Sequence, residues 1–374
     1  MFRNWKPKFF DLQANMHRIA VPLVAPKRSH GQLPTQQPLL FSEPEPDYRA
    51  IALGFFSWLR EFWNKTCHNL TRKSIADIPV RISLPSFGSI AHAESLLHDI
   101  LSEAGWRLDT VNPVLPEPLS NIIGALSNGE NAVMKASGNI DLGAMFRQTG
   151  LLERMRESTL GSGPRTAWVM IVDVGGYTTD FAMIGLDLTD LYNDLSEDID
   201  GKPALRHLSR PLGITDLDKR MQLALPSAKG VAIEKRINDP DSYLLEMMHM
   251  NLYNKLSQPI GGGQAIGGTI TEKKLVQNVI ADFAADVAAC AEDFLNAHSY
   301  DAIDDLILTG GGAQIETVRK IVVDRLRHYN VKRAHCHFPD EGKPFPAPYR
   351  RLDAQLPRGA TAIGASSVYF DFST

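Results

Sequence analysis

The chain has 374 residues, of which 44% are hydrophobic and 22% charged, and its formal net charge is −4. This composition is typical of a globular protein with room for two lobes, and the charge balance favours neither nucleic acid nor an acidic membrane surface as a partner. No stretch reaches the roughly 20 apolar residues of a membrane span, the first residues do not form a secretory signal, and the three cysteines fit neither a zinc site nor a disulfide framework, so we expect a cytoplasmic protein.

Residues 1–47 are expected to be irregular, because prolines recur throughout them and break any long helix. From residue 48 to 64, apolar side chains recur at intervals of three and four, a pattern typical of a core-facing amphipathic helix. Residues 79–85 then alternate like a half-buried strand. The next helix is expected to be capped by Ser89 and ended by Gly105.

A short strand and a helix are predicted between residues 111 and 126, joined at Glu117 and with Pro118 in the first helical turn. The helix dipole alone explains a glutamate at this position, because negative charge is favourable near a helix N-terminus. Residues 127–166 are polar and rich in glycine, and a short apolar helix is expected within them, over residues 142–155.

The most informative stretch is residues 173–180, which read Asp-Val-Gly-Gly-Tyr-Thr-Thr-Asp between two apolar runs. This pattern predicts a β-hairpin whose turn gathers backbone N–H groups, hydroxyls and two carboxylates at one end of the strands. Successive free N–H groups bind anions, and a neighbouring carboxylate can hold Mg²⁺, usually through water. An ordinary hairpin turn would explain the two glycines alone, but the full spacing indicates a phosphate with its metal.

Residues 186–210 are acidic and rich in turn-forming residues, and we expect a solvated insertion there. A helix is then predicted near residue 214, with Thr215 or Asp216 as its N-cap. The clearest helix follows Thr271, which is expected to cap it. Its predicted buried side carries Leu275, Ile280, Phe283, Val287, Ala291, Phe294 and Leu295.

A second glycine-rich turn is predicted further along the chain. A buried strand over residues 304–309 runs into Gly310, Gly311 and Gly312, and a helix follows. Glycines at a strand-to-helix turn let a flat ligand or a phosphate approach the backbone closely, although the motif by itself is weak. Residues 358–365 predict a helix of small residues that permits close packing against another helix.

In this order the motifs resemble the actin-like ATPase superfamily, which includes actins, sugar kinases and the seventy-kilodalton heat-shock chaperones. They are most similar to the ATPase (nucleotide-binding) domain of the chaperones. Residues 173–180 resemble the second phosphate loop, although Tyr177 stands where the chaperones have a third glycine. The Glu-Pro pair that starts at Glu117 resembles the opening of the helix that crosses between the lobes. Residues 310–312 resemble the adenosine loop, and residues 358–365 resemble the closing inter-lobe helix.

The resemblance implies a two-lobed α/β fold of the actin-like, ribonuclease-H-like type with an incomplete first lobe. The first lobe would comprise residues 48–165 and would be closed by residues 358–374. The second lobe would comprise residues 166–357 and would carry both glycine-rich turns. Residues 1–47 would stand outside both lobes.

The resemblance also implies a site for ATP or ADP with Mg²⁺. Asp173 and Asp180 are the expected metal ligands, and both are expected to take part in catalysis. Two further catalytic residues are expected, Glu117 near the attacking water and Thr178 facing the terminal phosphate. The residues expected to contact the nucleotide are Gly175, Gly176, Tyr177, Gly213, Gly310, Gly311 and Gly312. No stretch reproduces the chaperone pattern that packs against adenine.

Two parts of the chaperone pattern are not found. No Asp-x-Gly-Thr string marks a first phosphate loop, and no peptide-binding domain follows Thr374. Three explanations stay open: a chain that continues before Met1, a degenerate relative, or a protein partner that supplies the missing edge. Half of a phosphate clamp lowers affinity and rate, because phosphoryl transfer depends on positioning and electrostatic stabilisation. We therefore expect a chaperone-like nucleotide switch that hydrolyses ATP slowly or not at all as an isolated chain.

Two alternative functions stay open as well. One is a filament-forming structural protein like the plasmid-segregation actins, which self-associates. Sedimentation with and without ATP distinguishes it from a monomeric switch, because filaments pellet. The other is a non-catalytic scaffold that kept the fold and lost the nucleotide, and a rise in melting temperature with nucleotide would exclude it.

Overall fold

The computed structural model describes residues 48–66, 79–86, 90–109, 114–127, 160–161, 166–188, 198–199, 201–224, 253 and 270–336. Four predictions lie outside these residues: the irregular segment 1–47, the cap at Ser89, the helix over residues 142–155 and the closing helix over residues 358–365.

The chain divides into two compact units. The first unit ends at Asp109 and contains helices α2 (Tyr48–Thr66) and α4 (Ile90–Glu103), which pack against each other. The second unit contains the other described helices and strands. The boundary between these units differs from residue 165, where the two predicted lobes meet. The division of the chain into two lobes therefore stays a prediction.

The predicted end of α4 at Gly105 is confirmed. Gly105 has a φ of +80°, a conformation that glycine adopts without a steric penalty. The N–H of Gly105 donates to the carbonyl of Ser102 at 3.0 Å, and the N–H of Trp106 donates to the carbonyl of Leu101 at 2.9 Å, which is the Schellman pattern. The indole N–H of Trp106 also donates to the carbonyl of Phe56 at 3.1 Å, so the end of α4 is tied to α2.

In the second unit, β1 (Ile82–Leu84) pairs in parallel with β2 (Val114–Pro116). Strand β2 runs directly into α5 (Glu117–Ser127), whose first turn contains Pro118. The predicted strand within residues 79–85 and the predicted junction of strand and helix at Glu117 are therefore confirmed.

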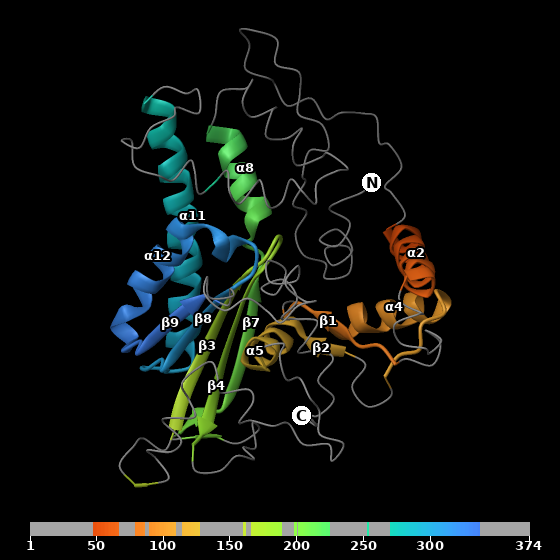
Figure 1. Ribbon diagram of the computed structural model, residues 1–374, viewed down its shortest axis with the longest axis horizontal. Helices are drawn as coiled ribbons and strands as arrows, with labels where there is room; N and C mark the ends of the chain where they lie inside the picture. Colours follow the sequence, from red (N-terminus) through yellow and green to blue (C-terminus); the bar gives the residue numbers. More distant parts are fainter. Residues whose placement is uncertain are drawn as a thin grey trace. The chain divides into compact units, whose positions relative to one another are not determined.

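The centre of the second unit is a mixed five-stranded sheet with the order β7-β4-β3-β8-β9 (Figure 1). The strands are β7 (Leu205–Arg210), β4 (Thr179–Asp187), β3 (Thr166–Val174), β8 (Asp305–Thr309) and β9 (Arg333–Cys336). Strand β4 pairs antiparallel with β3 and β7, whereas β8 pairs in parallel with β3 and β9. The predicted hairpin around residues 173–180 and the predicted strand before Gly310 are confirmed, and the fold is mixed α/β.

The prediction of a solvated insertion is wrong for residues 205–210. These residues form β7 at the edge of the sheet, and Ser209 within it is 1% exposed. Arg206 and Arg210 occupy exposed positions, and an edge strand tolerates such charges, so β7 lacks the apolar run that marks a buried strand. A short ribbon of β5 (Asp198–Ile199) and β6 (Lys202–Pro203) precedes it.

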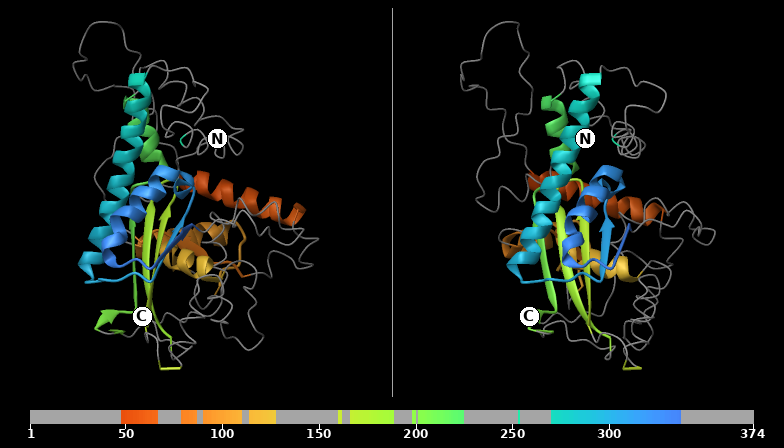
Figure 2. Two further views of the ribbon diagram at one scale, coloured as in Figure 1. Left: turned by 60° about the vertical axis from the view of Figure 1, so that its left-hand side comes forward. Right: turned by 90° about the vertical axis from the view of Figure 1, so that its left-hand side faces the viewer.

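Helices cover both faces of this sheet (Figure 1, Figure 2). One face, which carries Met170 and Val172, packs against α8 (Ile214–Ala224), α11 (Ile270–Ala297) and α12 (Glu316–Leu326). Helix α5 contacts β3, β4 and β7 from the opposite face. Side chains alternate along a strand, so Asp173 lies on the other face from Val172, and there it accepts a hydrogen bond from Asn121 of α5. Within the described ranges, no helix is both long and apolar enough to cross a membrane.

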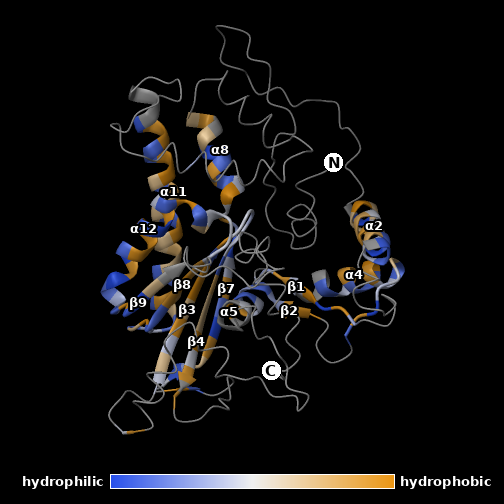
Figure 3. Ribbon diagram, viewed as in Figure 1, coloured by the Kyte–Doolittle hydropathy of each residue, from blue (hydrophilic) through white to orange (hydrophobic). Residues whose placement is uncertain are grey.

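The main hydrophobic core lies between the sheet and α11. Much of β3 and β4 is hydrophobic (Figure 3). Six residues of the predicted buried side of α11 are at most 1% exposed: Ile280, Phe283, Val287, Ala291, Phe294 and Leu295. Leu275 is 38% exposed, so the predicted side is wrong at that residue. Helix α11 begins at Ile270, so Thr271 lies in its first turn and is not its N-cap.

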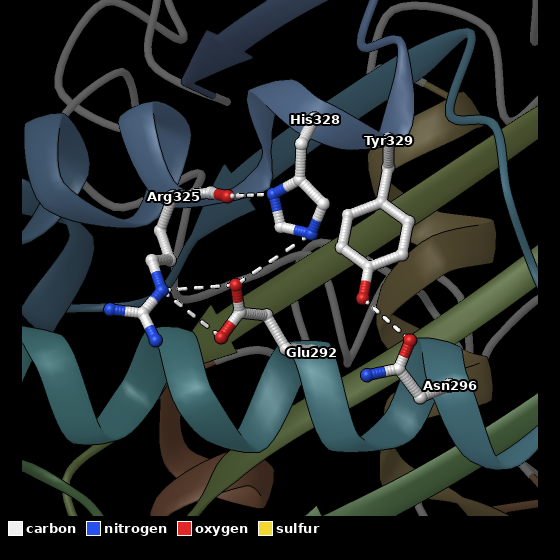
Figure 4. A network of polar contacts seen from close by, with 5 residues as sticks. All are labelled: Glu292, Asn296, Arg325, His328 and Tyr329. Atoms are coloured by element: carbon white, nitrogen blue, oxygen red, sulfur yellow. Dashed lines mark hydrogen bonds and ion pairs between the residues drawn. The ribbon is translucent and has the colours of Figure 1, made fainter.

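A polar network joins α11 to the end of α12 and the short 3₁₀ helix η3 (Arg327–Tyr329) (Figure 4). Arg325 Nε donates to both carboxylate oxygens of Glu292, at 3.0 and 3.1 Å. The Tyr329 hydroxyl donates to Asn296 Oδ1 at 2.8 Å. These contacts hold the C-terminal end of α12 against α11, which fixes the helix that follows the second glycine-rich turn.

Candidate functional site

Four polar residues lie in one row across the sheet, one from each of four adjacent strands. Asp173 of β3 is opposite Asp180 of β4 and also opposite Thr309 of β8, and Asp180 is opposite Ser209 of β7. Asp173 is 7% exposed, and the other three are at most 1% exposed. Like charges directly opposite each other in antiparallel strands are destabilising, and burial strengthens the repulsion. Hydrogen bonds, a cation or a proton on one carboxylate can offset the repulsion between two carboxylates in this row.

Hydrogen bonds reach the two carboxylates from different elements. The Asn121 side-chain N–H of α5 donates to Asp173 Oδ2. The Thr178 hydroxyl donates to Asp180 Oδ2 at 3.0 Å, and the Ser209 hydroxyl donates to Asp180 Oδ1. Asn121 and Ser209 were not predicted as site residues. The spacing of four residues from Glu117 was a signal for Asn121, because such residues share a helix face, whereas nothing in the charged strand β7 marked Ser209.

The turn between β3 and β4 is closed by its own backbone. The N–H of Gly175 donates to the carbonyl of Thr178 at 2.8 Å, and a Cβ at Gly175 would lie 2.9 Å from that carbonyl oxygen. Gly176 is exposed, and a Cβ added there meets no atom of the described residues within 4 Å. The turn therefore needs a glycine at its first position to close, and it leaves room for a ligand at its second.

The start of α8 supports this turn. The N–H of Ile214 donates to the carbonyl of Gly175 at 3.0 Å, and the N–H of Thr215 donates to the carbonyl of Gly176 at 2.8 Å. A Cβ at Gly213 would lie 2.6 Å from the backbone carbon of Tyr177, so only glycine permits this approach. Gly213 thus packs against the turn.

The predicted cap of α8 is wrong. The helix begins at Ile214, so Thr215 and Asp216 lie within its first turn. The Thr215 hydroxyl donates to the carbonyl of Gly176 at 2.6 Å instead of capping the helix. The backbone N–H groups of Asp216 and Leu217 donate to the carbonyl of Gly213, at 2.9 and 3.3 Å. The backbone N–H groups in the first turn of α8 and the Thr215 hydroxyl therefore all bond to backbone carbonyls, those of Gly175, Gly176 and Gly213.

The second glycine-rich turn lies directly beside the first, because β8 pairs with β3. Gly310 follows Thr309 and has a φ of +83°, and a Cβ there would lie 2.6 Å from the carbonyl oxygen of Val174 and would also meet Asp173. A Cβ at Gly312 would lie 2.9 Å from Ile214 Cδ1. Gly311 differs from both, since it has a helical backbone with φ −60° and ψ −38° and its Cβ would meet no described atom within 4 Å.

Glu117 is the first residue of α5, one helical turn before Asn121 and on the same side of the helix. The structure brings Asn121 into contact with Asp173. Helix α5 therefore brings the Glu117 side of its surface toward the polar row, while the predicted role of Glu117 beside a water molecule stays a prediction.

The donor set of the row fits a magnesium ion that is shared with phosphate. Among the described residues, no group of three or more histidine, cysteine or acidic side chains could hold a metal ion. The two opposed carboxylates, Asp173 and Asp180, could supply no more than part of a ligand set. Mg²⁺ in nucleotide sites keeps several waters and uses one or two carboxylates together with the phosphates, so a partial set is sufficient for that ion.

No model of a known protein family matches the sequence, and the search of curated proteins finds none similar to it.

The glycines at 310 and 311 are expected to respond differently to the same substitution. Gly310→Ala should lower the free energy of unfolding by about 2 kcal/mol or more, because its φ is positive and the new methyl group would collide with β3. Gly311→Ala should change it by less than about 0.5 kcal/mol, because the backbone there is helical and the space is free of described atoms. Urea denaturation measures both, and equal effects would contradict the packing described for Gly310.

His207 lies on the same side of β7 as Ser209, opposite Ala182 of β4. Burial, and then the positive charge of Arg206, lower the pKa of His207 below its ordinary value of 6.5. The folded protein therefore keeps this imidazole neutral in a pH range where the unfolded chain already binds a proton.

This lowered pKa makes stability depend on pH in a defined direction. The contribution of His207 is fully present above pH 6.5 and is lost as the pH falls through the lower pKa of the folded state. His207→Gln removes the titration, so the variant should lose less stability than the wild type between pH 7.5 and 5.5 in urea denaturation. The pKa of His298 is lowered as well, so the variant still loses some stability over this pH range. Equal losses in the two proteins would contradict the assignment.

Proposed function

We propose that this chain binds ATP or ADP together with Mg²⁺ at the end of the sheet where the two glycine-rich turns lie side by side. The observation that carries the proposal is the register of β3 with its two neighbours. It sets Asp173 opposite Asp180 and also beside the Gly310 turn. A divalent cation offsets the repulsion of the paired carboxylates, and phosphates complete its coordination.

The free space in the two turns supports a phosphate ligand. Gly176 and Gly311 are the two turn glycines at which an added side chain would meet no described atom within 4 Å. Neighbouring atoms therefore do not explain why these positions are glycine, and a glycine there permits close approach of a ligand to the backbone. In the proposed complex, Gly175, Gly176 and Tyr177 contact the phosphates, and the Gly310–Gly312 turn lies at the nucleotide.

The resemblance of the motifs to the actin-like ATPase superfamily supports a more specific proposal for the fold and for the function. We assign the chain the two-lobed actin-like ATPase fold and a role similar to that of the chaperone ATPase domain, a nucleotide-dependent switch that acts on a protein partner or through self-association. Because the sequence contains no Asp-x-Gly-Thr string, the isolated chain supplies half of the expected phosphate contacts. Slow or absent hydrolysis follows, since positioning and electrostatic stabilisation account for nearly all of phosphoryl-transfer catalysis.

A charge added at Gly176 tests phosphate binding at this site. Gly176→Asp should weaken the binding of Mg²⁺–ATP at least about tenfold relative to Gly176→Asn, because the two side chains have the same size and only the aspartate repels phosphate. Isothermal titration calorimetry measures both affinities, and melting temperatures without nucleotide verify that both variants fold equally. Equal affinities, or a wild type whose melting temperature ATP does not raise, would contradict the proposal.

Phosphate release tests the proposed rate. The purified chain with Mg²⁺–ATP should release phosphate far more slowly than about 1 s⁻¹, and Asp173→Ala, which removes one carboxylate of the pair, gives the background rate. A malachite-green assay over several hours measures both proteins. Release at ordinary enzymatic rates, on the order of 1 s⁻¹ or more, that Asp173→Ala abolishes would refute slow or absent hydrolysis.

A further inference from the structure

A continuous chain of hydrogen bonds runs from the first glycine-rich turn to the segment after β1. The Thr178 hydroxyl donates to Asp180 Oδ2 at 3.0 Å, and the Ser209 hydroxyl donates to Asp180 Oδ1. The N–H of Ser86 donates to Ser209 Oγ at 2.7 Å, and the N–H of Ser209 donates back to the carbonyl of Ser86 at 3.3 Å. We call these four residues the Thr178–Ser86 chain.

The donors in this chain are consistent with one another. Ser209 has a single hydroxyl proton, which it gives to Asp180, and its oxygen accepts from the Ser86 backbone. Asp180 acts as an acceptor on both oxygens and is 1% exposed. Because each Asp180 oxygen already accepts one buried hydroxyl and the side chain is 1% exposed, a hydrated metal ion has less access to Asp180 than to the more exposed Asp173.

The opposed carboxylate has different surroundings. Asp173 is 7% exposed, accepts from Asn121 of α5, and lies against Gly310 of the second turn. Of the two carboxylates, Asp173 is thus the one that touches both the helix and the turn on which the proposed nucleotide rests. The two side chains are opposite in register but not equivalent in contacts.

We infer that Asp180 and Ser209 are positioning residues, which hold the turn in its shape through the Thr178–Ser86 chain, and that Asp173 alone of the pair ligates Mg²⁺. The metal part of this inference rests on the proposed nucleotide function, whereas the positioning part does not. It revises the expectation from the motif, which assigned both carboxylates to the metal.

The positioning part is tested by hydrogen exchange in the full chain without nucleotide. Thr178→Val removes one hydroxyl at constant shape and should increase exchange at least about tenfold in the peptide that contains the Gly175 amide, since a hydrogen bond to a charged group is lost. Thr178→Ser keeps a hydroxyl and should restore protection. Ser209→Ala should act like Thr178→Val, whereas Ser120→Ala, which removes an equally buried hydroxyl bonded to Ser83, should leave the turn unchanged.

The metal part is tested with the same chemical change at each carboxylate. The ratio of ATP affinity with Mg²⁺ to that with EDTA is measured by calorimetry for the wild type, Asp173→Asn and Asp180→Asn. Asp173→Asn should lower this ratio at least about tenfold. Asp180→Asn, which can still accept from Thr178, should weaken both affinities alike and change the ratio by no more than about threefold.

The outcomes separate the two proposals. If the wild type binds ATP but Asp180→Asn lowers the ratio of ATP affinity with Mg²⁺ to that with EDTA at least about tenfold, the inference is overturned and nucleotide binding stands. A wild type that binds no nucleotide would overturn the proposed function and the metal part together. Hydrogen exchange then decides the positioning part, which unchanged exchange in both Thr178→Val and Ser209→Ala would refute.

Discussion

The arrangement of the elements around the candidate site is constrained by the opposition of two buried carboxylates, Asp173 and Asp180, at the end of the central hairpin. A buried charge without compensation costs several kcal/mol, so the surrounding elements have to supply donors. Helix α5 supplies Asn121 to one carboxylate, and the turn and β7 supply hydroxyls to the other. The packing of α5 on one face of the sheet and the pairing of β7 at its edge are therefore linked to the same pair of charges.

The glycines around this pair have two different physical roles. At Gly213, Gly310 and Gly312 an added side chain would collide with the opposing backbone or core, so these glycines let α8 and the second turn approach the first turn. At Gly176 and Gly311 the same addition meets no described atom within 4 Å. The first group allows close packing of the backbone around the site, and the second group leaves space beside the backbone. A site that is supported by packing on several sides needs little reorganisation when a ligand arrives, which favours binding.

Strong local patterns in the sequence were sufficient for most of the described fold. Apolar, β-branched runs predicted β3, β4 and β8, because a strand that is buried on both sides is apolar at nearly every position. Long helical periodicity predicted α11, because a helix that is buried on one side repeats its apolar residues every three or four positions. The same logic failed at β7, where Arg206 and Arg210 alternate with half-buried residues on an edge strand. It also misplaced the starts of α8 and α11, since hydroxyl and carboxylate side chains near a helix start suit the cap and the first turn alike.

The sequence by itself determined which residues could carry the chemistry: two carboxylates, two glycine-rich turns and a helix that starts with glutamate. Only the tertiary structure decided their partners. The register of β3 with β8 joins segments more than 130 residues apart, such as Asp173 and Thr309, and pairing over such a separation leaves no local signal in the chain, unlike the β3–β4 hairpin. The same holds for Asn121 and Ser209, whose contacts with Asp173 and Asp180 exist because a helix and an edge strand converge on one end of the sheet.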